Sequence, residues 1–244
     1  MVRLQYASDI HLDQLTEYLP SDLIRPNADV LILGGDICHF YVIEKHSLFF
    51  DYIANSFQYI VYVPGNHEFY TKTKDLSINM LENRAKQFLH KYPNIFYLNN
   101  SSVFINNILF TGSCLWCTPS VDPPEWFMIN LTKQDITKLC NESVDYLNKV
   151  SDMNKNQFRH IVVTHYPPIR IAYAYALNEK NEKRLKYRKY EEYYQNQDII
   201  LKYPPSIWIF GHIHKNMSMY LNNTLYLSNQ RKDNNYNREI AISI

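Results

Sequence analysis

Aspartate, asparagine and histidine residues recur directly after short apolar runs of this chain. The pattern occurs five times, and four of the five glycines lie within or directly beside these groups. Glycine permits tight turns and close approach of the backbone. Imidazole, carboxylate and amide oxygen together are typical ligands of Mn, Fe, Zn or Ni rather than of Ca. The side chains that could bind metal ions in this way are Asp9, His11, Asp36, Asn66, His165, His212 and His214.

Two of these groups have a spacing that favours a shared site. Asp9 and His11 are two residues apart, and so are His212 and His214. In an extended chain, residues two apart point to the same side, so each pair can bind one site together. In open α/β sheets, functional groups gather in the loops beyond the carboxyl ends of the strands. We therefore expect the five groups to converge.

Seven candidate ligands are too many for one ion of this kind. With one carboxylate bridging, they fit two ions about 3.5–4 Å apart. Two divalent ions, two carboxylates and one hydroxide sum to a charge of about +1. The residues therefore predict a dinuclear centre that attracts an anion, although the whole chain is nearly neutral, with a net charge of +1.

The elements that must position these groups are strands and helices in alternation. Short apolar runs predict buried strands at 2–7, 30–33, 59–63, 108–110, 161–163 and 207–210. The pattern predicts helices at 40–56, 74–91 and 132–150. Towards the C-terminus, a turn at Asn222-Asn223 and a final strand at 239–244 predict a meander that includes strands 217–221 and 224–227. The alternation favours an α/β layered fold with a mixed sheet.

The five groups resemble the calcineurin-like metallophosphoesterase family. Its pattern is D-x-H, G-D, G-N-H-[DE], H and G-H-x-H, and all five motifs stand here in that order, from Asp9 to His214. The resemblance therefore covers nearly the whole chain. It implies an α/β fold, a four-layer α/β/β/α sandwich of two mixed sheets, formed by residues 1–244 as a single domain. It also implies a metal-dependent phosphoesterase, a hydrolase acting on ester bonds.

The resemblance further implies a role for each motif residue. The first ion site would be formed by Asp9, His11, Asp36 and His214. The second would be formed by Asp36, which bridges, and by Asn66, His165 and His212. His67 would be a histidine that binds no metal but contacts the substrate and protonates the leaving oxygen as general acid. A hydroxide bridging two divalent ions (Mn, Fe, Zn, Ni or Mg, with Mn favoured) would attack phosphorus.

Some positions depart from the protein Ser/Thr phosphatase branch of that family. That branch continues G-D-x-V-D-R-G and has Arg before its G-N-H-E, whereas this chain reads Gly35-Asp36-Ile37-Cys38-His39-Phe40 and has Pro64 before Gly65. The arginines that bind phosphate in that branch are absent at both places, and His39 stands where its second Asp would lie. The chain is more similar to the compact phosphohydrolases of the family. A weaker similarity to that branch is present in residues 108–116 and in Asn229-Gln230-Arg231.

Several features leave the substrate open. Basic and aromatic residues alternate between Tyr173 and Tyr194, which is typical either of a nucleotide-binding segment or of a solvated helix. A Pro-rich loop at 117–130, with Trp126 and Phe127, and Trp116 just before it, could wall the pocket or pack on the body. Arg231 could lie near the mouth of the site or on the surface. The alternatives are a phosphodiesterase acting on cyclic nucleotides or nucleic acid, and a metal-free binding scaffold of the same fold.

Composition excludes several classes of function. With 25 basic and 24 acidic residues, the chain has no electrostatic footprint for extended nucleic acid or a membrane surface, so we expect a small phosphoester, such as a nucleotide. No apolar run is long enough to span a membrane, and the N-terminus lacks the apolar stretch of a signal peptide. The four cysteines are too few for a disulfide framework. We therefore expect a cytoplasmic protein with reduced thiols.

Overall fold

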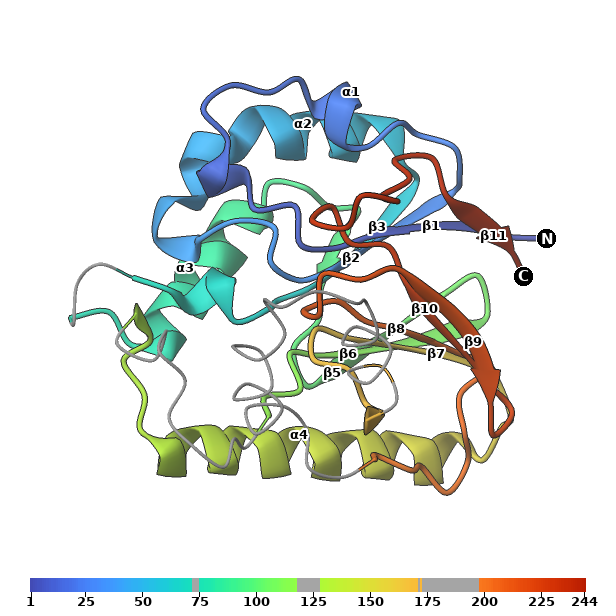
Figure 1. The fold of residues 1–244 in the computed structure, drawn as a ribbon. Helices are drawn as coiled ribbons and strands as arrows, with labels where there is room; N and C mark the ends of the chain where they lie inside the picture. The colour runs from blue at the N-terminus through green and yellow to red at the C-terminus, as the bar shows by residue number, and fades with distance from the viewer. Residues whose placement is uncertain (72–74, 118–127, 171, 173–197) are drawn as a thin grey trace, which may run out of the picture.

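The computed structural model describes residues 1–71, 75–117, 128–170, 172 and 198–244 (Figure 1). The segment 173–194 and the loop residues Trp126 and Phe127 lie outside the described residues. Eleven strands form two mixed sheets within the described part of the chain.

The first sheet has the strand order β11-β1-β2-β3-β4. Strands β1 to β4 are parallel, and β11 pairs with β1 in the antiparallel sense. Residues of β2 are buried throughout, as expected for a parallel strand covered on both faces. The strands are β1 (Arg3–Ala7), β2 (Val30–Gly34), β3 (Tyr59–Val63), β4 (Ile95–Tyr97) and β11 (Ala241–Ser243). Its helices are α1 (Pro20–Leu23), α2 (Ser47–Ser56) and α3 (Ile78–Leu89).

The second sheet has the strand order β5-β6-β7-β8-β10-β9, with antiparallel strands at its two edges. Helix α4 (Lys133–Asn154) lies along this sheet and begins at a capping box in which Thr132 and Asp135 each bind the backbone N–H of the other. The strands are β5 (Ser101–Ile105), β6 (Ile108–Ser113), β7 (Arg159–Thr164), β8 (Ile207–Ile209), β9 (Met217–Leu221) and β10 (Thr224–Ser228).

The sheets pack face to face, and helices cover their outer faces (Figure 1). Alternate residues of strands from both sheets, such as Ile32 and Val61 on one side and Phe110 and Val163 on the other, form one apolar core between them. A further core lies between α4 and the second sheet, and another beneath α2 and α3. This is the α/β/β/α sandwich that the resemblance implied.

Some local predictions were wrong. The predicted hairpin of 217–221 and 224–227 forms, as the antiparallel pair β9 and β10. It does not continue as a meander, because β10 pairs in parallel with β8 and the final strand, β11, joins the other sheet. Side chains that an apolar pattern cannot reveal tie this segment to β1: Gln5 donates to the Arg238 carbonyl, and Asn229 donates to the carbonyls of Tyr6 and Asn237.

The predicted helix at 40–56 is split into a 3-10 segment, η2 (Phe40–His46), and α2, with a kink at Val42. The other 3-10 segments are η1 (Leu12–Gln14) and η3 (His67–Phe69). Strands β4 and β5 were not predicted. All four cysteines are buried thiols. No helix of the described residues has the length and apolar character needed to cross a membrane.

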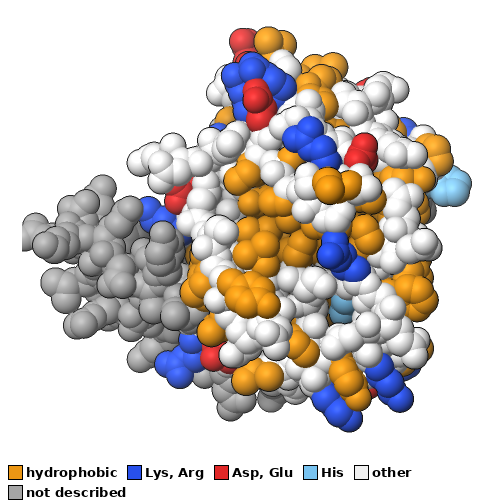
Figure 2. All heavy atoms as spheres, turned by 90° about the vertical axis from the view of Figure 1, so that its right-hand side faces the viewer, with side chains coloured by type: hydrophobic (Ala, Val, Ile, Leu, Met, Phe, Trp, Pro, Cys, Tyr) orange, Lys and Arg blue, Asp and Glu red, His pale blue; other side chains and the backbone are white. Residues whose placement is uncertain are grey.

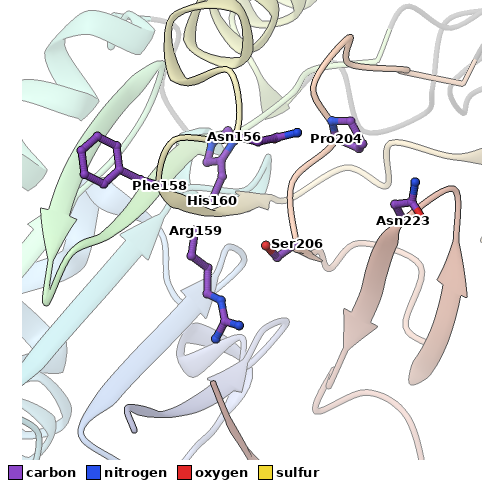
Figure 3. Close-up of a pocket in the computed structure, with 7 residues that line it drawn as sticks. All are labelled: Asn156, Phe158, Arg159, His160, Pro204, Ser206 and Asn223. Atoms are coloured by element: carbon purple, nitrogen blue, oxygen red, sulfur yellow. The ribbon is translucent and has the colours of Figure 1, made fainter.

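The two ends of the sandwich differ. The end at which β1 begins carries apolar side chains in its middle, with Lys and Arg around them (Figure 2). A cavity of 440 Å³ lies at this end, before β7, β8 and β10 begin, and is lined by Asn156, Phe158, Arg159, His160, Pro204, Ser206 and Asn223 (Figure 3). The motif residues follow the opposite, carboxyl ends of the strands.

Candidate metal centre

The predicted ligands converge where the carboxyl ends of the two sheets meet. Gly34, the last residue of β2, accepts a hydrogen bond from the Nδ1 atom of His165, which follows β7 in the other sheet, at 2.9 Å. Gly211 after β8 in turn donates its N–H to the His165 carbonyl at 2.9 Å. These contacts bring the loops of both sheets to one place, as the motif positions predict.

Asp36 lies in the middle of this place and is only 2% exposed. Its Oδ1 atom is 3.3 Å from His165 Nε2. Its Oδ2 atom is 3.7 Å from His11 Nε2 and 3.8 Å from His67 Nε2. One carboxylate therefore faces histidines from three different loops, which is the arrangement expected of a bridging ligand.

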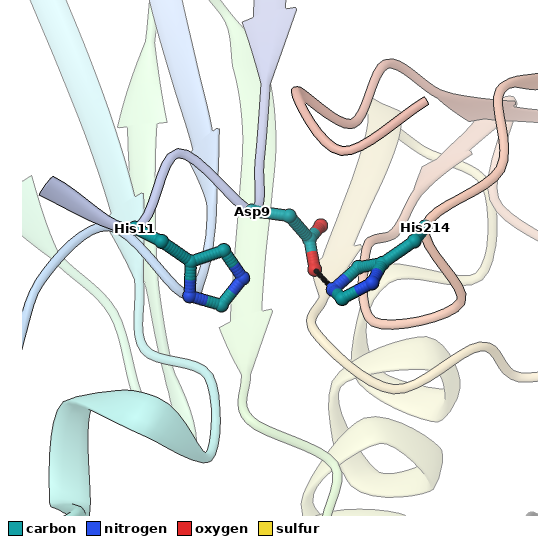
Figure 4. A group of neighbouring side chains, drawn as sticks. All are labelled: Asp9, His11 and His214. Carbon is teal, nitrogen blue, oxygen red and sulfur yellow. Dashed lines mark ion pairs between the residues drawn. The ribbon is translucent and has the colours of Figure 1, made fainter. Parts of the chain in front are cut away.

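Asp9 forms the second carboxylate of the cluster and is fully buried. Its Oδ1 atom is 3.3 Å from His214 Nε2 (Figure 4). Ser8 donates to Oδ2 at 2.6 Å, and the backbone N–H of His212 donates to the carboxylate at 3.1 Å. The loops after β1 and β8 are therefore joined through Asp9.

The Asn66 amide is oriented by its neighbour. Its Nδ2 group donates to the Tyr70 hydroxyl at 2.8 Å, and its Oδ1 atom lies 3.0 Å from His165 Nε2. Because the NH₂ group is held by Tyr70, the amide oxygen faces the cluster, as a metal ligand requires.

The donor atoms fit divalent ions. Three overlapping triads each have donor atoms within 4.8 Å of one another: Asp9, His11 and His214; His11, Asp36 and His67; and Asp9, Asp36 and His165. The second triad contains His67, which is not a predicted ligand, and the predicted ligand His212 belongs to none of the three. Both ring nitrogens of His11 are buried and lack a hydrogen-bond partner within the described part of the chain. Burial of a polar atom without a hydrogen-bond partner costs free energy, and binding of a metal ion by a ring nitrogen of His11 would offset this cost.

The backbone holds five of the seven predicted ligands in the left-handed region. Their φ angles lie between 50° and 73°. For a residue other than glycine this conformation costs about 1–3 kcal/mol and persists only where the surroundings enforce it, typically at functional sites. The five residues are Asp9, His11, Asp36, His212 and His214.

Two glycines leave room for the carboxylates. A Cβ atom at Gly211 would lie 2.7 Å from Asp9 Oδ2, and one at Gly65 would overlap Asp36 Oδ1 and lie 2.7 Å from the Asp36 nitrogen. The glycines beside the motif residues are therefore required by close approach, as the sequence predicts.

Glu68 has a role that sequence reasoning did not assign, although it stands in the fourth position of the G-N-H-[DE] motif. It is fully buried and accepts hydrogen bonds at 2.8 Å from the backbone N–H groups of Asp36, Ile37 and Gly65. The Tyr62 hydroxyl donates to it at 2.9 Å. Burial, together with the charge of Asp36, raises the pKa of Glu68 to about 7. This carboxylate joins the loops after β2 and β3.

Burial and charge give the histidines different protonation states. Burial lowers the pKa of His11 to about 4 and that of His212 to about 3, so both rings are neutral at pH 7. Burial also opposes protonation of His165, but the Asp36 carboxylate more than offsets it and raises the pKa of His165 to about 9. Burial tends to raise the pKa of Asp36, yet His165 and His67 hold it well below its usual value.

His67 lies at the open side of the cluster. Its side chain is 25% exposed, and its ring stacks on Tyr70 with 4.2 Å between centroids. His39 lies 6.0 Å away in a stacked arrangement and pairs with Asp13 at 3.2 Å. The Nδ1 atom of His67 is buried and has no hydrogen-bond partner among the described residues, so no carboxylate binds this nitrogen there. This agrees with the presence of His39 at the position where the Ser/Thr phosphatase branch has an aspartate.

The remaining residues of interest are divided between core and site. Trp116 is buried, and its ring centroid lies 5.7 Å from that of Phe69 and 6.1 Å from that of Tyr166, so it belongs to the core. Arg231 lies at the site, because its Nε atom donates to the carbonyl of Ile10, between Asp9 and His11, at 2.5 Å.

Comparisons with known proteins agree with this geometry. The model of the calcineurin-like phosphoesterase family matches residues 5–216. The uncharacterized protein L509 of Acanthamoeba polyphaga mimivirus is 27% identical over an alignment 274 positions long, which spans 99% of this chain and 96% of that protein.

Two solved structures share the fold. The phosphopantetheinyl hydrolase PptH of Mycobacterium tuberculosis has a TM-score of 0.69 at 14% identity, with 97% of this chain and 90% of PptH covered. The protein TT1561 of Thermus thermophilus has a TM-score of 0.55 at 14% identity, with 95% of this chain and 90% of TT1561 covered. The family match over most of the chain and the carboxylate–histidine cluster at the strand ends lead to one conclusion: the chain belongs to the calcineurin-like phosphoesterase family of metal-dependent phosphoester hydrolases.

Proposed function

We propose that this protein hydrolyses a small phosphoester at a centre of two divalent ions. The observation that carries the proposal is the position of Asp36, whose two carboxylate oxygens face His165 on one side and His11 and His67 on the other. Asp9 and His214 would complete one half of this centre. Asn66, His165 and His212, whose ring centroid lies 5.2 Å from that of His165, would complete the other.

Two divalent ions supply Lewis acidity towards the phosphoryl oxygens and lower the pKa of water. The protein provides their positions. Nδ1 of His165 is held by the Gly34 carbonyl, which leaves Nε2 to face the Asn66 oxygen and Asp36. A hydrogen bond to the second nitrogen fixes the ring orientation of a ligating histidine in this way. The mixed imidazole, carboxylate and amide donors suit Mn, which we favour, as well as Fe, Zn or Ni.

His67 is proposed as the general acid. Its ring is fixed by stacking on Tyr70, and its Nε2 atom faces the same space as Asp36 Oδ2. Since the side chain is partly exposed, Nε2 can reach the leaving oxygen of a bound phosphoester and deliver a proton to it.

The substrate class is tested by a panel. The absence of arginine from the second and third motifs favours activity on monoanionic diesters besides monoesters, because a dianionic monoester needs more positive charge. The panel should contain nitrophenyl phosphate, bis-nitrophenyl phosphate, cyclic nucleotides and, since PptH is a phosphopantetheinyl hydrolase, a phosphopantetheinyl ester.

The experiment is to strip the protein with a chelator and to add Mn, Mg, Zn or Ni before each assay. We expect hydrolysis of at least one small ester, loss of activity on chelation and recovery with Mn. Metal analysis separates the alternatives: a chain that binds no divalent ion and hydrolyses nothing would be a binding scaffold of this fold.

A further inference from the structure

The segment Asn229–Lys232 follows β10 and lies against the loops that carry the candidate ligands. The buried Gln230 accepts a hydrogen bond at 2.6 Å from the backbone N–H of His214. The backbone N–H of Arg231 donates to the Ser8 carbonyl at 3.1 Å, and its Nε atom donates to the Ile10 carbonyl at 2.5 Å. Arg231 therefore binds the chain on both sides of Asp9.

Nε is the only side-chain atom of Arg231 with a hydrogen bond or ion pair inside the described ranges, so its two terminal NH₂ groups remain available there. The side chain is half-buried, and burial lowers the pKa of this guanidinium. Partial burial of a cation without an acidic partner costs free energy, and a bound anion would offset this cost. Lys232 adds a positive charge nearby. Its ammonium donates to the side chain of Gln14, in the 3-10 segment η1 that begins directly after His11.

We propose that Arg231 binds the non-bridging oxygens of the substrate phosphate and makes the site selective for a dianionic phosphomonoester. The proposal rests on the proposed function of the same site. A guanidinium presents a planar pair of donors that matches phosphate. Arg231 would provide, from the C-terminal part of the chain, the positive charge that the second and third motifs lack. It thereby weakens the reason for expecting a diesterase.

The test measures binding by calorimetry on protein loaded with Mn, with inorganic phosphate as the dianion and dimethyl phosphate as the monoanion. Removing one charge-assisted hydrogen-bonding group costs about 1.5–3 kcal/mol. Arg231→Gln should therefore weaken phosphate binding about 10- to 100-fold, and dimethyl phosphate binding much less. Arg231→Lys should recover part of the loss. Arg238→Gln, which removes an arginine that pairs with Asp22 at 3.6 Å, is the matched control and should bind phosphate like the wild type.

Metal analysis of the same samples excludes a purely structural role. If the Arg231→Gln variant lost its metal ions, or if its binding of phosphate and of dimethyl phosphate weakened equally, Arg231 would only hold the loop around Asp9. Unchanged phosphate affinity, or a wild type that binds no phosphate, would also overturn the proposal. A wild type that binds phosphate through Arg231 but hydrolyses no ester would contradict the proposed function alone.

Discussion

Asp36 Oδ1 and His165 Nε2 lie 3.3 Å apart, although one residue follows a strand of the first sheet and the other a strand of the second. Burial tends to raise the pKa of Asp36, but the His165 imidazole, with His67, holds it well below its usual value. The carboxylate is therefore ionised at neutral pH. The pair connects the two halves of the sandwich at the point where the ions are proposed to bind.

Replacement of Asp36 should remove metal as well as activity. The purified protein should hold up to two divalent ions per chain, and Asp36→Ala or Asn66→Ala should lower this content, because each side chain completes a coordination sphere. Metal analysis after reconstitution with Mn measures the effect. Asp51→Ala is a control of the same type, since Asp51 lies on α2 and binds Tyr92 away from the cluster. Full metal content in both motif variants would contradict the ligand assignment.

His67→Ala should separate chemistry from metal binding. The variant should keep its ions and its fold, yet lose about 10²–10⁴ in turnover on esters with poor leaving groups, because general acid catalysis is lost. The loss should shrink for nitrophenyl esters, whose leaving group needs little protonation. An equal loss on both ester types would show that His67 does not protonate the leaving oxygen. His90→Ala, at an exposed position after α3, serves as control.

The convergence of the motifs could be predicted because each group of ligand residues directly follows the strand that positions it. Carboxylate, amide and imidazole stand directly after apolar strands, and the carboxyl ends of parallel strands share one end of a sheet. The sequence could not predict that Asp9, His11 and Asp36 adopt positive φ angles, since Asp and His adopt this conformation more often than most residues but still rarely. The contacts of the whole cluster enforce it.

Long-range contacts explain the other differences. Two side chains hold the segment before β11 beside the first sheet. Gln5 in β1 donates to the carbonyl of Arg238, more than two hundred residues away, and Asn229 donates to the carbonyl of Asn237. Neither contact has a periodic signature. Arg231 is a similar case, because its role depends on the Ile10 carbonyl, which is far away in the sequence.

Glu68→Ala should destabilise the fold far more than a typical loop substitution. The change leaves three buried backbone N–H groups without their acceptor, at about 1–3 kcal/mol each when measured singly. We expect the free energy of unfolding to fall by about 3–5 kcal/mol, measured by urea denaturation. Glu239→Ala breaks only an exposed ion pair with Arg25 and should cost at most about 1 kcal/mol. Similar losses in both variants would contradict the role given to Glu68.

His160 makes the stability of the fold depend on pH at the end of the sandwich opposite the metal centre. The residue is 2% exposed, and its Nε2 atom lies 2.9 Å from the Thr111 hydroxyl. Burial lowers the pKa of His160 from 6.5 to about 4. Between these values the unfolded chain binds a proton that the folded chain does not. The contribution to stability is therefore complete above pH 6.5 and is lost as the pH falls through 4.

His160→Gln should remove this dependence while keeping a polar atom for Thr111. Compared with the variant, the wild type should lose more of its free energy of unfolding between about pH 7 and about pH 4.5, measured by urea denaturation at each pH. His11 and His212, whose pKa values burial also lowers, are present in both proteins and cancel in the comparison. His90→Gln, the same substitution at an exposed position after α3, is the control for the exchange itself. Parallel profiles of wild type and His160→Gln would mean that the folded protein admits a proton at His160, through rearrangement around the cavity that this residue lines.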